Sequence, residues 1–140
     1  MRYWLMKSEP DVFSWDDLVA TGTRGEQWDG VRNYQARNNM RAMELGDQVF
    51  YYHSNIGLEI VGIAEVCALS HPDSTAGEDT RWDCVDIRAV KPMPQPVSLK
   101  QVKATPELAN MSLVTSMRLS VQPVTPEEWA LVCRMGGLSD

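Results

Sequence analysis

The residues best suited to chemistry lie in one stretch of the sequence, from Gln27 to Met40, which reads QWDGVRNYQARNNM. It combines one tryptophan, an Asp-Gly turn, three asparagines and two arginines, a mixture that a helix serving only the core does not need. An indole suits the face of a flat heteroaromatic ring, and amides can pair with the edge of a base. We therefore expect a recognition surface, in which Trp28 stacks on a base and Asn33 hydrogen-bonds its edge.

The arginines of this stretch and of its continuation are candidates for holding phosphate groups. Arg32, Arg37 and Arg41 face only one acid in the same part of the sequence. Guanidinium groups bind phosphate through charge and paired hydrogen bonds. Plainer explanations remain open, because Trp28 could be a core residue beneath a loop and the arginines could form a solvated helix face.

Polar residues also end the first predicted strand, at Lys7-Ser8-Glu9. Strand ends are places where barrels present ligand-binding groups, although these residues are equally consistent with a polar turn. Trp82 is a second candidate aromatic wall, with a place in the core as the alternative.

A hydrolytic site in the YYHS run at residues 51–54 is disfavoured. His53 and Ser54 are neighbours on a predicted strand, so their side chains point to opposite faces. Neither a G-x-S-x-G elbow nor the H-x-E…C-x-x-C deaminase signature is present in the sequence. We expect no catalytic residues, while a nucleotide hydrolase or deaminase that uses His53 stays open as the alternative from another class.

Composition limits the class of partner. The 140 residues fit one domain, and the net charge of −6 argues against bulk nucleic-acid binding while leaving room for a few phosphates on the basic stretch. No apolar run reaches the ~18 residues of a membrane helix. The cysteines are three and scattered, which disfavours a disulfide framework or a zinc site. We expect a cytoplasmic protein with no metal, no cofactor and no membrane partner.

The order of predicted elements is that of a mixed α/β protein. Strands are expected at 2–8, 47–54, 58–69, 82–90 (ended by prolines 92, 94 and 96) and 118–122. Helices are expected after the cap at Ser14, at 33–43, 98–103 and 105–107, and after Thr125, and loops at 23–27 and 71–80. Ala36, Met40 and Met43 recur at helical spacing and should face the core. Gly62 marks a bend, a bulge or a close backbone approach, and long strands with peripheral helices indicate a small curved β-barrel.

Taken whole, the sequence closely resembles the EVE-domain family. The matching runs follow in order: YWLMKSEP (3–10), SWDDL (14–18), WDGVRNYQARNNMRAM (28–43), GDQVFYYHS (46–54), EIVGIAEV (59–66), HPDSTA (71–76), RWDCVDI (81–87) and RLSVQPVTPEEW (118–129). The WDGVRNYQARN run is highly specific. The resemblance implies one EVE domain over residues 1–140 with a PUA-like fold, in the superfamily of the YTH domains that read methylated adenine in RNA.

The resemblance also implies a function. EVE domains are regarded as readers of modified bases, notably modified cytosines in DNA, and have no established catalytic activity. By position, Lys7-Ser8 and Trp28 are similar to the strand-end polar residues and the first cage tryptophan of YTH domains. A second wall would come from the strand at residues 51–54 or from Trp82. Glu9-Pro10 stand where YTH domains are Asn-rich, which disfavours methylated adenine.

The combined expectation is a monomeric, non-enzymatic module that takes a modified base, flipped out of DNA rather than RNA, into an aromatic pocket. Stacking and edge hydrogen bonds would recover the cost of extruding the nucleotide. The predicted ligand-binding residues are Lys7, Ser8, Trp28, Asn33, Tyr51, Ser54 and Trp82. The predicted phosphate-binding residues are Arg32, Arg37 and Arg41. A sensor of free nucleosides using the same pocket is the remaining alternative.

Overall fold

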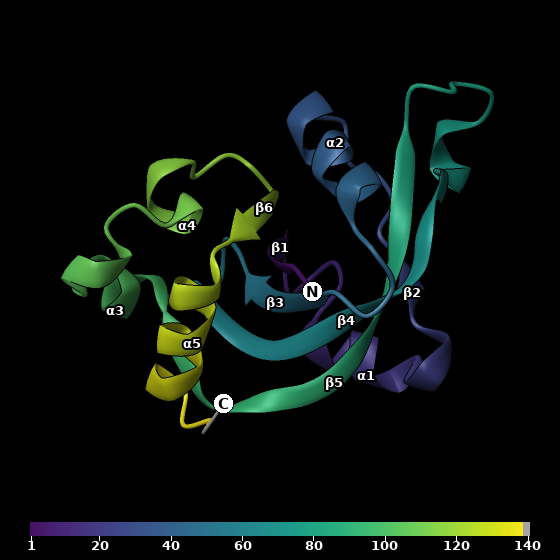
Figure 1. Ribbon diagram of the computed structural model, residues 1–140. Coiled ribbons are helices and arrows are strands. Elements are labelled where there is room, and N and C mark those ends of the chain that lie inside the picture. Colours follow the sequence, from purple (N-terminus) through teal and green to yellow (C-terminus); the bar gives the residue numbers. More distant parts are fainter. Residues whose placement is uncertain (139–140) are drawn as a thin grey trace.

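The computed structural model describes residues 1–138 and shows one six-stranded sheet with helices around it (Figure 1). The strands are β1 (Tyr3–Ser8), β2 (Glu26–Gln27), β3 (Gln48–His53), β4 (Glu59–Pro72), β5 (Asp83–Ser98) and β6 (Val121–Val124). Their order in the sheet is β2-β5-β4-β3-β1-β6, with β1 parallel to β3 and the other pairs antiparallel. The helices are α1 (Trp15–Ala20), α2 (Tyr34–Ala42), α3 (Leu99–Lys103), α4 (Ser112–Thr115) and α5 (Pro126–Met135).

Each face of the sheet is covered by its own hydrophobic cluster. On β3, Val49 and Tyr51 belong to the cluster that includes α1 and α2, whereas Phe50 and Tyr52 belong to the cluster that includes α3, α4 and α5. In Figure 1 the last three helices gather on one side of the molecule and α2 stands beside the long β4–β5 hairpin. Because both faces are buried, β3 is apolar at consecutive positions rather than at alternate ones.

The predicted helix starts are confirmed. α1, α3 and α5 each begin with a capping box, formed by Ser14 with Asp17, Ser98 with Gln101 and Thr125 with Glu128. α2 begins at Asn33, whose side chain accepts from the backbone N–H of Ala36. The residues predicted to face the core from this helical stretch, Ala36, Met40 and Met43, are all buried.

The β4–β5 hairpin is longer than the sequence predicts. β4 continues through His71 and Pro72, which were expected in a loop, and β5 continues through all three prolines to Ser98. Proline is tolerated at sheet edges and bulges. Both conditions hold here. The prolines lie on a free edge of β5, because β2 pairs with β5 only near Ile87, and they lie opposite a shift in the β4–β5 register. The two-residue strand β2, within the predicted loop 23–27, was too short to give a pattern.

Gly62 in β4 is a point of close approach, as predicted. A Cβ there would lie 2.5 Å from the ring of Trp15, and the strand register shifts beside it. We expect Gly62→Ala to lower the free energy of unfolding by roughly 1–3 kcal/mol, the usual cost of overpacking. Denaturant unfolding would measure this. If the ring contact is the cause, Trp15→Phe should partly rescue the alanine variant, and strictly additive losses in that double-mutant cycle would contradict it.

The mixed α/β class is confirmed, whereas closure of the sheet into a barrel stays a prediction. The recorded pairings leave β2 and β6 as edges of the sheet within residues 1–138. The single domain was predicted for 1–140, and its last two residues lie outside the described part. In that part, no helix has the length and apolar character needed to cross a membrane. Nor do histidine, cysteine, aspartate and glutamate side chains of residues 1–138 gather in threes as a metal site requires.

Candidate functional site

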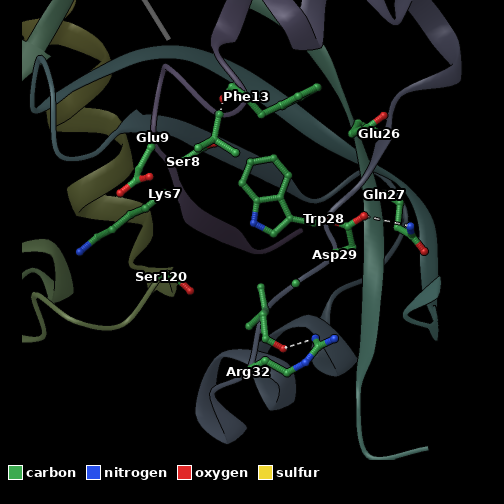
Figure 2. A pocket seen from close by; sticks show the side chains of 13 residues that line it. Lys7, Ser8, Glu9, Phe13, Glu26, Gln27, Trp28, Asp29, Arg32 and Ser120 are labelled. Atoms are coloured by element: carbon green, nitrogen blue, oxygen red, sulfur yellow. Dashed lines mark hydrogen bonds between the residues drawn. The ribbon is translucent and has the colours of Figure 1, made fainter. Parts of the chain in front are cut away.

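A pocket of about 440 Å³ opens where the end of β1 meets the segment that leads into α2 (Figure 2). Residues 7–9, 12–13 and 26–32 line it, together with Ser120. Its size is that of a small-molecule site. The structure therefore brings the strand-end polar residues and the stretch singled out in the sequence to one cavity.

Trp28 is held rigidly at this pocket. Its backbone N–H donates to the carbonyl of Val85 at 2.9 Å, and its ring meets Phe13 and Tyr51 edge-on, with centroids 6.5 Å and 5.6 Å away. Trp28 is only 8% exposed, as expected of a core residue, and it also lines the pocket, so it serves in both places. Figure 2 shows the indole projecting among the lining side chains, with its nitrogen turned toward the open space. Within residues 1–138 no acceptor is recorded for the indole N–H, and that nitrogen is not sealed from solvent.

Ser8 and Tyr51 fix the wall behind the indole. Both hydroxyls donate to the carbonyl of Phe13, each at 2.7 Å. Burial raises the pKa of Tyr51, so its hydroxyl remains protonated and able to donate. Ser8 lines the pocket and keeps acceptor capacity on its oxygen, whereas Tyr51 is fully buried and supports Trp28 from outside the lining.

Charged groups of both signs surround the opening. The Lys7 ammonium donates to the carbonyl of Met117 at 2.6 Å, and partial burial lowers its pKa. The carboxylates of Glu9 and Asp29 and the guanidinium of Arg32 share the lining. The pocket therefore offers donors and acceptors at its rim and apolar surface within, which is how small-molecule sites fix the orientation of a ring.

A buried aspartate outside the lining holds the pocket loop in place. The side chain of Asp73 accepts from the backbone N–H of Gly30 at 2.8 Å and from Arg32 at 3.1 Å, and it also accepts from the backbone N–H and hydroxyl of Thr75. Its carboxylate is 1% exposed. Burial alone would raise the pKa, but the hydrogen bonds from Thr75, Gly30 and Arg32 outweigh it and lower the pKa of Asp73 to about 2.

The other predicted site residues lie outside this lining. Asn33 is committed to capping α2, and the backbone N–H of Ser54 bonds to the carbonyl of Ser8. Trp82 is stacked on Tyr34, with ring centroids 5.0 Å apart. Arg37 donates to the carbonyl of Arg81, and Arg41 pairs with Asp83 at 2.7 Å.

The structure thus brings four of the predicted site residues together at the pocket: Lys7, Ser8, Trp28 and Arg32. A role in ligand binding stays a prediction for the other six, which are Asn33, Tyr51, Ser54, Trp82, Arg37 and Arg41.

His53, the residue of the catalytic alternative, has a structural partner. Its Nε2 accepts from the backbone N–H of Trp15 at 3.0 Å, at the start of α1. Burial lowers the pKa of His53, which favours the neutral ring that this hydrogen bond requires. This hydrogen bond at the start of α1 gives His53 a structural role, and that role does not require the histidine to take part in a reaction.

Several pocket residues were not predicted from the sequence. Phe13, Glu26 and Ser120 line the cavity, and Asp73 orders its loop. A local signal existed only for Asp73, since an aspartate followed by Ser-Thr is typical of a turn in which the carboxylate bonds the backbone two residues on. Phe13, Glu26 and Ser120 are far apart in the sequence, and only the folded chain brings them to one cavity.

Comparisons with known proteins agree with this architecture. The family model described as the EVE domain matches residues 2–135. Mouse thymocyte nuclear protein 1 is 38% identical over 162 aligned positions, which cover 94% of this chain and 72% of the relative. A crystal structure of a protein from Agrobacterium tumefaciens superimposes with a TM-score of 0.99 at 71% identity, over 100% of this chain and 96% of that one. Human THYN1, solved in complex with DNA containing 5-methylcytosine, superimposes with a TM-score of 0.92 at 36% identity over 100% of both chains.

Proposed function

This chain belongs to the EVE-domain family, and from that premise we propose that it is a non-enzymatic DNA-binding protein that recognises a modified cytosine in the pocket at Trp28. The observation that carries the proposal is the similarity of this chain, over its whole length, to the solved chain of human THYN1, whose structure contains 5-methylcytosine DNA. We further propose that the curved sheet is PUA-like, with the pocket at its mouth.

The chemistry of the lining supports cytosine as the base. Cytosine has one donor, its N4 amino group, and two acceptors, N3 and O2. Asp29 or Glu9 can accept from the amino group, and the ammonium of Lys7 can donate to a ring acceptor while the indole of Trp28 stacks on the face of the base. Thymine would place its O4 acceptor against a carboxylate, which is repulsive. The lining is therefore complementary to cytosine rather than thymine.

The lining also suits a small substituent on the base. Val12, Phe13 and Val31 contribute apolar side chains to the same cavity. A methyl group at C5 would lose contact with water and gain contact with such side chains, which is favourable. A fitted apolar pocket can distinguish one methyl group by about 1–3 kcal/mol.

Overall charge favours reading one extruded base over binding a long tract. The chain carries a net charge of −6, and Arg32, the arginine that lines the pocket, is already paired with Asp73. Few phosphate contacts imply a weak dependence of affinity on salt. Affinity must then come largely from the base in its pocket.

Fluorescence anisotropy with matched oligonucleotides tests the proposal. The set carries cytosine, 5-methylcytosine, 5-hydroxymethylcytosine or N6-methyladenine at one position, in DNA and in RNA, at two salt concentrations. We expect a preference of roughly tenfold or more for a modified cytosine in DNA, the size of effect that one methyl group has in a fitted pocket. Equal, weak and strongly salt-dependent binding to all of them would refute it.

A further inference from the structure

A stacked aromatic pair with one exposed ring lies beside the pocket. Tyr34, the first residue of α2, stacks on Trp82 with centroids 5.0 Å apart and an angle of 21° between the rings. Trp82 is buried beneath, whereas Tyr34 is 52% exposed. Arg32 connects the pair to the pocket, because it lines the cavity and its guanidinium lies 5.4 Å from the Trp82 ring. We call Tyr34, Trp82, Arg37 and Arg81 the Tyr34 platform.

One guanidinium of this platform has no acidic partner in the described part of the chain, residues 1–138. Arg37 lies 4.9 Å from the Tyr34 ring and bonds neutral acceptors, the Asn38 side chain and the Arg81 carbonyl. The neighbouring arginines differ from Arg37 because each of them is paired with an acid. These ion pairs are Arg32–Asp73, Arg41–Asp83 and Arg81–Asp79. No ion pair is recorded for Arg37 within residues 1–138. Arg37 therefore presents positive charge beside an exposed aromatic ring.

We propose that the Tyr34 platform holds the DNA strand next to the base in the pocket, with Tyr34 packed against the neighbouring nucleotide and Arg37 on its phosphate. The proposal rests on the function proposed above. Aromatic rings support bases without regard to sequence, and guanidinium groups bind phosphates. The shared Arg32 makes the platform continuous with the pocket, and the positive charge of Arg37 complements the polyanion, so the strand leaving the pocket is the occupant that fits.

The platform is ordered before DNA binds. Trp82 supports one side of the Tyr34 ring, and Arg81 donates to the tyrosine hydroxyl at 3.4 Å. A surface that is already fixed loses little side-chain freedom on binding, so more of the contact is available as affinity. The contacts that fix the exposed Tyr34 ring in the free protein are therefore those expected of a preformed binding surface.

Tyr34→Ala and Arg37→Gln test the platform, with Tyr34→Phe and the α5 variant Arg134→Gln as matched controls. Each is titrated with a methylated duplex, the same duplex unmethylated, and free 5-methyldeoxycytidine. We expect Tyr34→Ala to weaken both duplexes by about tenfold, within the range for a lost base–aromatic contact, and to leave nucleoside binding unchanged. Arg37→Gln should reduce the salt slope by about one phosphate contact. Both controls should bind as the wild type does.

The outcomes separate the platform from the proposed function. If Tyr34→Ala and Arg37→Gln bind both duplexes like the wild type, the platform is refuted, and a wild-type preference for the methylated duplex would leave the function intact. If Tyr34→Ala also weakens nucleoside binding, it acts on the pocket and the platform is refuted as a strand contact. If the wild type does not distinguish the duplexes, the function fails, and a tenfold loss on the unmethylated duplex would still support the platform as a DNA contact.

Discussion

Replacement of Trp28 by alanine is expected to remove the preference for DNA that carries a modified cytosine. Stacking on one aromatic ring contributes about 1–3 kcal/mol to the binding of a base. The same change removes the indole N–H, which has no partner within residues 1–138, faces the cavity and, because it lies in the plane of the ring, can donate to a DNA group beside the stacked base. Affinity for a methylated oligonucleotide should therefore fall toward the level of an unmethylated one, as measured by anisotropy titration of both.

Trp28→Phe separates the two contributions of the indole. Phenylalanine keeps an aromatic face and lacks the N–H, so it should retain part of the affinity and lose the part that comes from the hydrogen bond. Thermal unfolding of both variants is needed as a control, because Trp28 packs edge-on against Phe13 and Tyr51 and its loss leaves a cavity. A folded Trp28→Ala protein that kept its full preference would show that the base binds elsewhere.

The features that were predictable from the sequence are those governed by near neighbours in the chain. A capping box joins two residues three positions apart, so the starts of α1 and α5 were visible at Ser14 and Thr125. The helical spacing of Ala36 and Met40 identified the buried face of α2 for the same reason. The resemblance to a known family supplied the place of Trp28 at a strand-end pocket, which composition and spacing alone could not.

The features that were not predictable depend on residues far apart in sequence. Arg41 is about forty positions from Asp83, so a solvated helix face and an ion pair give the same sequence pattern. The prolines of β5 are ordinary strand terminators, and they are tolerated here because of an irregular register with β4 that no local pattern reports. The ring stacking of Tyr34 on Trp82 likewise joins two segments that only the sheet brings together.

Replacement of Asp73 should destabilise the protein and loosen the pocket, although Asp73 does not line the cavity. Asp73→Ala would remove a buried carboxylate that accepts hydrogen bonds from the Gly30 N–H, the Arg32 guanidinium and Thr75. The expected loss in the free energy of unfolding is roughly 2–4 kcal/mol, as for buried hydrogen bonds that involve a charged group. DNA affinity should also fall, because residues 29–32 would lose their hydrogen bonds to Asp73 and be held less firmly against the β4–β5 hairpin.

Asp83→Asn is the matched control in the same hairpin. Asp83 pairs with Arg41 near the surface, and such pairs contribute about 0–1 kcal/mol, so this variant should be nearly as stable as the wild type and bind DNA equally well. Comparable losses in Asp73→Ala and Asp83→Asn would point to the charge of the hairpin rather than to loop positioning.

The pH dependence of Asp73→Asn gives a second, independent check. The pKa of Asp73 is lowered from 3.8 to about 2 in the folded protein, so the unfolded chain takes up a proton first as the pH falls. The carboxylate therefore contributes its full stability above the unfolded pKa, and this contribution is lost as the pH falls through the folded value. The difference in unfolding free energy between wild type and Asp73→Asn should be constant from neutral pH down to about pH 5 and should narrow below pH 4. A difference that stayed constant down to pH 3 would mean that the asparagine acts through its shape and not through the missing charge.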